Sequence, residues 1–211
     1  WTKLNQWRYK KKYSKVNKFY KLINMKLKIC GLSKAAEVDI CVANEVEFCG
    51  FILNYPKSHR YISFDMAKNL TKINKQKSKY VGVLVKPSDE ELKKFSKLNL
   101  DYFQLYGDYD DEALSVIKNK FKIKIIASIQ VKRKIDVQNY KKIEKESDII
   151  LWDSTGYEES VSWNFDWIKS ATTNREKMIA GNINIEKLTY LANLTDIVDV
   201  SGALETNKVK D

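Results

Sequence analysis

Residues 80–128 read YVGVLVKPSDEELKKFSKLNLDYFQLYGDYDDEALSVIKNKFKIKIIAS. Three short runs in this stretch are rich in apolar and β-branched residues, which is the composition of buried strands. Two longer amphipathic segments separate them, and the first opens with Ser88 followed three residues later by Glu91, a pattern typical of a helix N-terminus. The stretch therefore predicts parallel strands joined by helices. The three strands are Tyr80–Val85, Asp101–Leu105 and Lys122–Ser128.

The same rhythm extends in both directions, from Met25 to the end of the chain. Strand starts lie 19 to 33 residues apart, which leaves room for one helix between each pair. Ser33 before Lys34–Asn44 and Ser63 before Phe64–Ile73 are the expected helix caps. Eight alternations favour an α/β protein with a closed (β/α)8 barrel over an open doubly wound sheet. The other five strands are Lys26–Cys30, Glu47–Leu53, Asp148–Trp152, Lys177–Ala180 and Asp196–Val200.

The composition is that of a packed globular protein, with 44% hydrophobic residues, 7 Gly and 2 Pro in 211 residues. Three cysteines without a secretory signal predict a reducing compartment, and we expect a cytoplasmic protein. No apolar run approaches the roughly 18 residues of a membrane span, so no membrane partner is expected. His59 is the only histidine, which argues against a histidine-based triad or zinc site. We therefore expect no metal.

The net charge of +11 is concentrated at one end of the chain. Residues 1–24 hold eight basic and no acidic side chains, which leaves +3 for the other 187 residues. A nucleic-acid partner for the whole chain is therefore weakly supported. The basic residues are Lys3, Arg8, Lys10, Lys11, Lys12, Lys15, Lys18 and Lys21.

The same segment has an apolar stripe at helical spacing, so the sequence divides into a basic amphipathic helix or extension over 1–24 and a barrel over 25–211. Asp211 follows the eighth strand too soon for the helix expected there. The segment either takes the place of that eighth helix, in a monomer or a swapped dimer, or is a solvated basic tail. In the first case we expect Lys11, Lys15 and Lys18 to face solvent. The stripe is Tyr13, Val16, Phe19, Tyr20 and Ile23.

Reactive side chains of such barrels sit at the carboxyl ends of the strands. Cys30 ends the first strand, although a cysteine in an apolar strand is more often a buried hydrophobe. Asp153 ends the sixth strand, where the alternative is a loop cap. Arg60 follows the second strand and is either a partner for an anion or a surface charge. Small-residue turns after strands seven and eight predict backbone contacts to phosphate; they contain Gly181, Asn182, Ser201 and Gly202.

From Lys26 to Asp211 the chain resembles the phosphoribosylanthranilate isomerase family of tryptophan biosynthesis. The resemblance implies a (β/α)8 barrel, no cofactor and a phosphorylated small-molecule substrate. The activity implied is the Amadori rearrangement of N-(5-phosphoribosyl)anthranilate to 1-(2-carboxyphenylamino)-1-deoxyribulose 5-phosphate. The motifs that carry it are Lys28-Ile29-Cys30-Gly31, Tyr55-Pro56-Lys57-Ser58 to Arg60, Gln104-Leu105-Tyr106-Gly107, Leu151-Trp152-Asp153-Ser154, Ala180-Gly181-Asn182 and Val198-Asp199-Val200-Ser201.

The resemblance also implies roles for single residues. Asp153 is the implied acid, Cys30 the implied base, and Arg60 the partner of the anthranilate carboxylate. The acid requires a raised carboxyl pKa, and the base requires a thiol pKa lowered by its surroundings. Asp199 is expected to line the mouth of the barrel. Gly181, Asn182, Ser201 and Gly202 correspond to the phosphate loops.

Three departures from the family pattern are visible. Asn182 replaces a second glycine, and an asparagine tolerates the left-handed backbone of such a turn. Gly202 is displaced by one position within the last phosphate loop. Tyr106 stands where the family often has histidine. Cys41 and Cys49 match no functional position and are interpreted as core residues.

Two other functions are left open by the residues. The basic segment can be an arm that binds an acidic partner, on an enzyme or on an inactive barrel. The barrel can also act on a different sugar phosphate, because phosphate loops are shared among unrelated barrel enzymes. Cys30, Asp153 and Arg60 together favour the isomerase.

Overall fold

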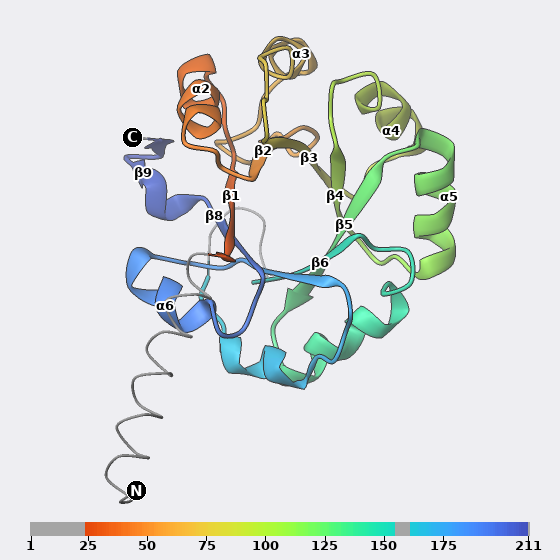
Figure 1. The fold of residues 1–211 in the computed structure, drawn as a ribbon. Helices are drawn as coiled ribbons and strands as arrows, with labels where there is room; N and C mark the ends of the chain where they lie inside the picture. Colours follow the sequence, from red (N-terminus) through yellow and green to blue (C-terminus); the bar gives the residue numbers. More distant parts are fainter. Residues whose placement is uncertain (1–23, 155–160, 211) are drawn as a thin grey trace, which may run out of the picture.

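The structure, a computed structural model, describes residues 24–154 and 161–210. Within these ranges eight parallel strands pair in sequence order, and β1 pairs with both β2 and β8 to close the barrel. The strands ring the centre and the helices lie outside them (Figure 1). The predicted α/β class and closed barrel are confirmed. The strands are β1 (Lys26–Cys30), β2 (Phe48–Ile52), β3 (Lys79–Val85), β4 (Tyr102–Tyr106), β5 (Lys124–Val131), β6 (Ile149–Ser154), β7 (Glu176–Ile179) and β8 (Ile197–Val200).

The helical layer changes character along the chain. The connections after β1 to β4 are regular α-helices, whereas those after β5 and β6 are 3₁₀ helices and the one after β7 is a short mixed helix. The α-helices are α2 (Ala35–Ala43), α3 (Phe64–Leu70), α4 (Asp89–Phe95), α5 (Asp111–Phe121) and α6 (Leu188–Leu191). The 3₁₀ helices are η1 (Lys134–Lys142), η2 (Phe165–Ser170), η3 (Ile185–Lys187) and η4 (Gly202–Leu204), and a hairpin of β9 (Glu205–Thr206) and β10 (Val209–Lys210) follows.

Alternate side chains of each strand enter two separate apolar layers, because successive residues of a strand point to opposite faces. Phe48, Val81 and Ile126 belong to the cluster inside the barrel. Phe51 and Trp152 belong to the larger cluster between strands and helices. Cys41 and Cys49 lie in this outer layer as free, buried thiols, as expected. The inner layer fills the barrel and supports the polar residues at its carboxyl end.

Two of the three helix caps predicted from the sequence are confirmed. The Ser63 hydroxyl accepts a hydrogen bond from Met66 N, and Ser88 and Glu91 form a reciprocal capping box. The Ser33 cap is wrong, because α2 begins one residue later than expected, after Lys34. There the Glu37 carboxylate accepts from the backbone N–H groups of Ser33 and Lys34, which precede the helix.

The seam beside β1 is covered differently from the others. After β8 the described residues continue into η4 and the β9–β10 hairpin, and Leu27 and Ile29 on the outer face of β1 are only partly buried. The helix predicted around Tyr13, Val16, Phe19, Tyr20 and Ile23, with its solvent-facing lysines, lies outside the described residues. Its placement over this seam remains a prediction.

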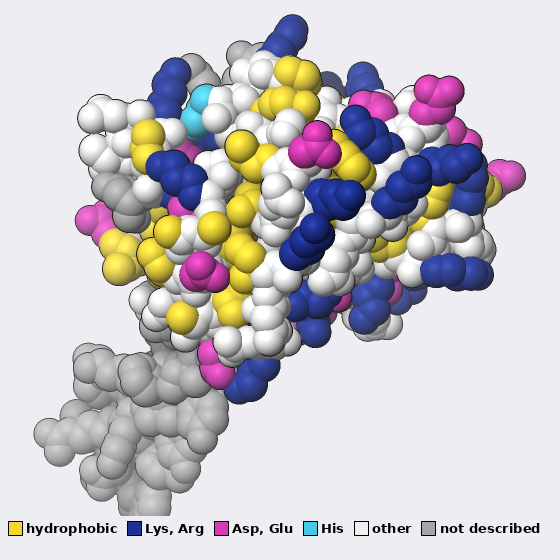
Figure 2. Space-filling model, turned by 90° about the horizontal axis from the view of Figure 1, so that it is seen from above, with side chains coloured by type: hydrophobic (Ala, Val, Ile, Leu, Met, Phe, Trp, Pro, Cys, Tyr) yellow, Lys and Arg dark blue, Asp and Glu magenta, His cyan; other side chains and the backbone are white. Residues whose placement is uncertain are grey.

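Charges of both signs are mixed on the surface. On the face in Figure 2, Lys and Arg side chains are spread over the helices with Asp and Glu side chains among them. Several form exposed ion pairs, such as Lys77 with Glu45 and Lys120 with Asp89. In the part of the chain that the structure describes, no helix is both long enough and apolar enough to cross a membrane.

We expect Ser88→Ala to lower the free energy of unfolding by about 0.5 to 2 kcal/mol, because the N-terminus of α4 loses an acceptor. Ser33→Ala is the matched control, since this serine also precedes a barrel helix but does not cap it. Urea denaturation followed by circular dichroism measures both. Equal losses in the two variants would contradict the assignment of the caps.

Candidate active site

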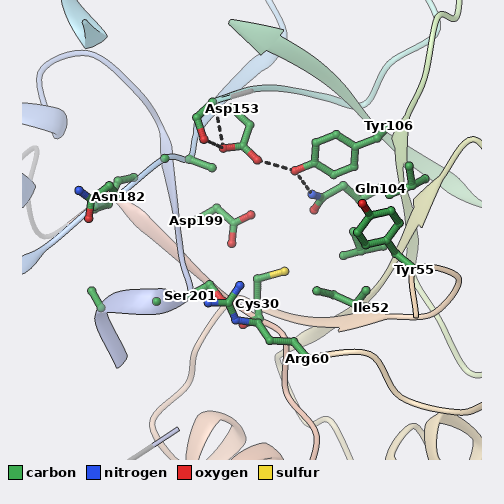
Figure 3. A pocket seen from close by; sticks show the side chains of 18 residues that line it. Cys30, Ile52, Tyr55, Arg60, Gln104, Tyr106, Asp153, Asn182, Asp199 and Ser201 are labelled. Atoms are coloured by element: carbon green, nitrogen blue, oxygen red, sulfur yellow. Dashed lines mark hydrogen bonds between the residues drawn. The ribbon is translucent and has the colours of Figure 1, made fainter. Parts of the chain in front are cut away.

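One pocket opens at the carboxyl ends of the strands, and its lining contains every site residue that the sequence predicted. Figure 3 shows side chains from opposite sides of the barrel pointing into it. The predicted residues in this lining are Cys30, Arg60, Asp153, Gly181, Asn182, Asp199, Ser201 and Gly202. The structure therefore brings together residues from five separate parts of the sequence.

Asp153 lies near the end of β6 and faces the barrel interior. The Tyr106 hydroxyl donates a hydrogen bond to its Oδ2 at 2.7 Å, and Gln104 Nε2 donates to that hydroxyl at 3.1 Å. Its other oxygen accepts from the backbone N–H of Ser154, so the expected loop contact is present as well. Burial raises the pKa of Asp153 from 3.8 to about 6, although the Tyr106 hydrogen bond opposes this rise. The carboxyl group is thus able to hold a proton near neutral pH, as the acid role requires.

Cys30 ends β1 on the opposite side of the pocket, with its sulfur directed inward (Figure 3). The expectation of a lowered thiol pKa is wrong for this structure. Burial raises the pKa of Cys30, and the nearby Lys28 ammonium opposes the rise without cancelling it. Desolvation disfavours the thiolate inside the barrel more than one neighbouring cation favours it.

Asp199 projects from β8 between these two groups (Figure 3). Its Oδ2 accepts a hydrogen bond from Lys28 Nζ at 2.8 Å, and both side chains are buried. Burial raises the pKa of Asp199, which the Lys28 charge counteracts. Within the described residues its Oδ1 is buried and has no hydrogen-bond partner.

Arg60 is fixed by a carboxylate that the sequence analysis did not single out. Glu205 accepts from Arg60 Nε at 2.6 Å and from Nη2 at 2.8 Å, and it also meets His59 and Lys210. Burial would raise the pKa of Glu205, but these three partners lower it to about 2. The Arg60 stem packs against Gly31, whose φ of +80° and missing side chain make the close approach possible. The guanidinium is thus held at the rim of the pocket.

The turn after β7 has the backbone shape expected of it. Gly181 has φ +107° and Asn182 has φ +46°, so the asparagine does adopt the left-handed conformation. Lys187 Nζ donates to Asn182 O at 2.7 Å and closes this turn. The Ser201 hydroxyl donates to Cys30 O at 2.9 Å and so ties the β8 turn to the end of β1.

Sequence reasoning missed three residues of this site. Lys28 could have been found, because it is two residues before Cys30 and so shares the inward face of β1. Tyr106 was noted only as a departure from the family, and Glu205 gave no signal because its partner Arg60 is 145 residues away. Within residues 24–154 and 161–210 no group of three or more His, Cys, Asp or Glu could hold a metal ion.

The family model of N-(5'-phosphoribosyl)anthranilate (PRA) isomerase matches residues 27–211, which is nearly the whole barrel. The chain belongs to this family. A PRA isomerase of Streptococcus mutans serotype c is 33% identical over 193 residues, covering 88% of this chain and 92% of its own length. A PRA isomerase of Listeria monocytogenes serotype 4b is 32% identical over 198 residues, covering 89% and 93%.

Solved PRA isomerase structures share the fold. A Thermotoga maritima structure superposes with a TM-score of 0.74 at 27% identity, covering 89% of this chain and 93% of the other. Another family structure, with a TM-score of 0.71 and 24% identity over 89% and 92% of the two chains, is a complex with reduced 1-(o-carboxyphenylamino)-1-deoxyribulose 5-phosphate. That ligand carries both a carboxylate and a phosphate.

We expect Tyr106→Phe to raise the pKa of Asp153 further, because the lost hydrogen bond stabilises the ionised carboxylate. A hydrogen bond to a charged group contributes roughly 1.5 to 3 kcal/mol, which corresponds to a rise of about 1 to 2. A titration of the Asp153 carboxyl carbon by NMR measures it. Tyr109→Phe is the control, since Tyr109 does not contact Asp153 in the described hydrogen bonds.

The raised pKa of Asp153 also determines how the stability of the protein changes with pH. The folded pKa of about 6 exceeds the ordinary 3.8, so ionisation of Asp153 costs stability, and the free energy of unfolding falls as pH rises between these values. In Tyr106→Phe this fall extends to higher pH. An unchanged Asp153 titration in Tyr106→Phe would show that the hydroxyl does not act on the carboxyl group.

Proposed function

We propose that this protein isomerises N-(5'-phosphoribosyl)anthranilate, with Asp153 as general acid and Cys30 as general base. The observation that carries the proposal is the placement of these two side chains on β6 and β1, facing one pocket, in a chain of the PRA isomerase family. The reaction is a step of tryptophan biosynthesis. It needs proton transfers at different atoms of one sugar, and Asp153 and Cys30 supply a titratable group on each side of the pocket.

The first transfer opens the sugar ring. Asp153 gives its proton to the ring oxygen, the bond from that oxygen to C1 breaks, and the nitrogen lone pair forms a C1=N double bond. A carboxyl group with a pKa of about 6 retains a useful fraction of its acid form near neutral pH. Tyr106 then stabilises the carboxylate that remains, because its hydroxyl already donates to Oδ2.

The second transfer moves the double bond. The Cys30 thiolate removes the proton from C2, the electron pair forms C1=C2, and the iminium nitrogen becomes neutral. The resulting enol becomes the ketone of the product when C1 gains a proton and the C2 hydroxyl loses its own. The proton that Asp153 gives to the ring oxygen is matched by the proton that Cys30 takes from C2, so atoms and electrons balance and the proposed reaction needs no oxidant or reductant. Catalysis without a cofactor or metal remains a prediction.

The two ends of the substrate meet different parts of the pocket. We assign the anthranilate carboxylate to Arg60, whose Nη1 side is turned away from the Nε and Nη2 atoms that bind Glu205. Backbone N–H groups of the turns after β7 and β8 are assigned to the phosphate. Asp199, which also lines the pocket, is assigned to a sugar hydroxyl. The turn residues are Gly181, Asn182, Ser201 and Gly202.

Oligomeric state and location are further parts of the proposal. A T. maritima relative of 24% identity, with a TM-score of 0.77, is described as a monomer generated from a dimeric enzyme, which concerns that protein. For this chain a monomer or a swapped dimer remains a prediction. The buried free thiols Cys30, Cys41 and Cys49 support a reducing compartment such as the cytoplasm.

We expect Cys30→Ala and Asp153→Asn each to lower turnover by at least ~10²-fold, the lower end of what a positioned acid or base contributes. Turnover is measured by following the loss of fluorescence of freshly prepared substrate. Cys41→Ala and Asp148→Asn are matched controls, because they lie in the outer layer and at the opposite end of the barrel. Wild-type turnover in either folded test variant would reject the assigned roles.

We expect Arg60→Ala to weaken a carboxylate-bearing product analogue by about 10-fold or more, since a charge-assisted hydrogen bond contributes roughly 1.5 to 3 kcal/mol. Inorganic phosphate should bind nearly as in the wild type, because its contacts lie in the turns. Calorimetric titration measures both ligands. Arg175→Ala is the control arginine outside the pocket. Equal weakening of the two ligands by Arg60→Ala would show that Arg60 does not select the carboxylate.

A further inference from the structure

A buried lysine lies under the pocket, and the two proton transfers above do not use it. Lys28 occupies the middle of β1 and is 0% exposed. The strand register places it directly opposite Asp199 of β8, and the ammonium donates to that carboxylate at 2.8 Å. Removing an ammonium group from water is costly unless its partners compensate. Packing alone therefore does not explain why a lysine is buried at this position.

Lys28 also approaches the sulfur of Cys30. The two residues are separated by one position in a strand, so both side chains face the barrel interior. Gly50, on the neighbouring strand β2, marks where they meet. A Cβ built on Gly50 would lie 3.1 Å from Cys30 Sγ and 3.1 Å from Lys28 Nζ. The glycine therefore leaves the space in which the ammonium and the sulfur are neighbours.

The charges around the thiol act in opposite directions. Lys28 favours the thiolate through its charge and as a hydrogen-bond donor, and Lys210 from the terminal hairpin favours it more weakly. Asp199 disfavours the thiolate from β8. Tyr106 of β4 and Asp153 of β6 face the same space. Among the described neighbours Lys28 is thus the strongest opponent of the desolvation that keeps the thiol protonated.

We propose that Lys28 is a positioning residue for the Cys30 base: its buried ammonium supplies the counter-charge that lets the thiolate form inside the barrel. Asp199 holds the ammonium in place by accepting its hydrogen bond, which the side-chain oxygen of an asparagine can also do. The inference rests on the proposed function only in calling Cys30 a base. The coupling between Lys28 and Cys30 is a property of the protein alone. A lysine that merely neutralised Asp199 would leave the ionisation of Cys30 untouched.

The test measures the ionisation of Cys30 without the isomerase reaction. Wild-type protein is alkylated with iodoacetamide between pH 6 and 11, and modification of Cys30 is followed by peptide mass spectrometry, because only the thiolate reacts. Cys30→Ala supplies the background from the two other cysteines. The variants are Lys28→Met, Asp199→Asn and the double variant Lys28→Met/Asp199→Asn. Lys26→Met is the matched control, since this lysine is on the same face of β1 but pairs with Glu176 at the other end.

Opposite shifts are expected from the two single variants. The midpoint of the alkylation profile should rise by about one pH unit or more in Lys28→Met, because an opposite charge at this range changes a pKa by roughly 1 to 3. It should fall in Asp199→Asn, which removes the opposing carboxylate, and stay unchanged in Lys26→Met. General loosening of the barrel would move both single variants in the same direction.

The double variant covers the case in which Lys28→Met fails to fold because Asp199 is left buried without its counter-charge. Compared with Asp199→Asn, it isolates the effect of Lys28, and its midpoint should again be higher by about one pH unit. Coincident profiles for these two proteins would overturn the proposal. Shifts of the expected sign in a protein that does not turn over the substrate would support the coupling and contradict the proposed function instead.

Discussion

Closure of eight parallel strands into a ring sends every second side chain into a space from which water is excluded. Apolar residues fill most of it, and a charged side chain is tolerated there only with a partner. The Lys28–Asp199 pair meets this condition by bridging β1 and β8, the two strands whose pairing closes the ring. The pocket above this ion pair is also shielded from water, and so are the titratable groups that line the pocket.

Desolvation helps one of the two proposed catalytic groups and hinders the other. It raises the pKa of the Asp153 carboxyl group to about 6, which suits an acid. It also raises the pKa of the Cys30 thiol, which works against a base. One uniform environment cannot serve both, so Cys30 needs a neighbour that favours its charged form. The Lys28 ammonium is that neighbour, whereas the Tyr106 hydroxyl limits the rise of the Asp153 pKa.

The rim of the pocket is organised by a second charge cluster. Glu205 binds Arg60 through two nitrogens and is itself held by Lys210 and His59. The short β9–β10 hairpin therefore connects the end of the described chain to the loop after β2. An arginine already fixed in this way loses little conformational freedom when it meets a ligand carboxylate.

The sequence by itself determined the order of strands and helices, the inward phase of Cys30 and Asp153, and the caps at Ser63 and Ser88, because these depend on local patterns. Strand ends were less certain: β5 runs three residues beyond its predicted end because Ile129–Val131 continue to pair with β6. Only the tertiary structure decided the partners. Lys28 and Asp199 are 171 residues apart, Tyr106 and Asp153 are 47 apart, and the pKa of Cys30 follows from burial that exists only once the barrel has closed.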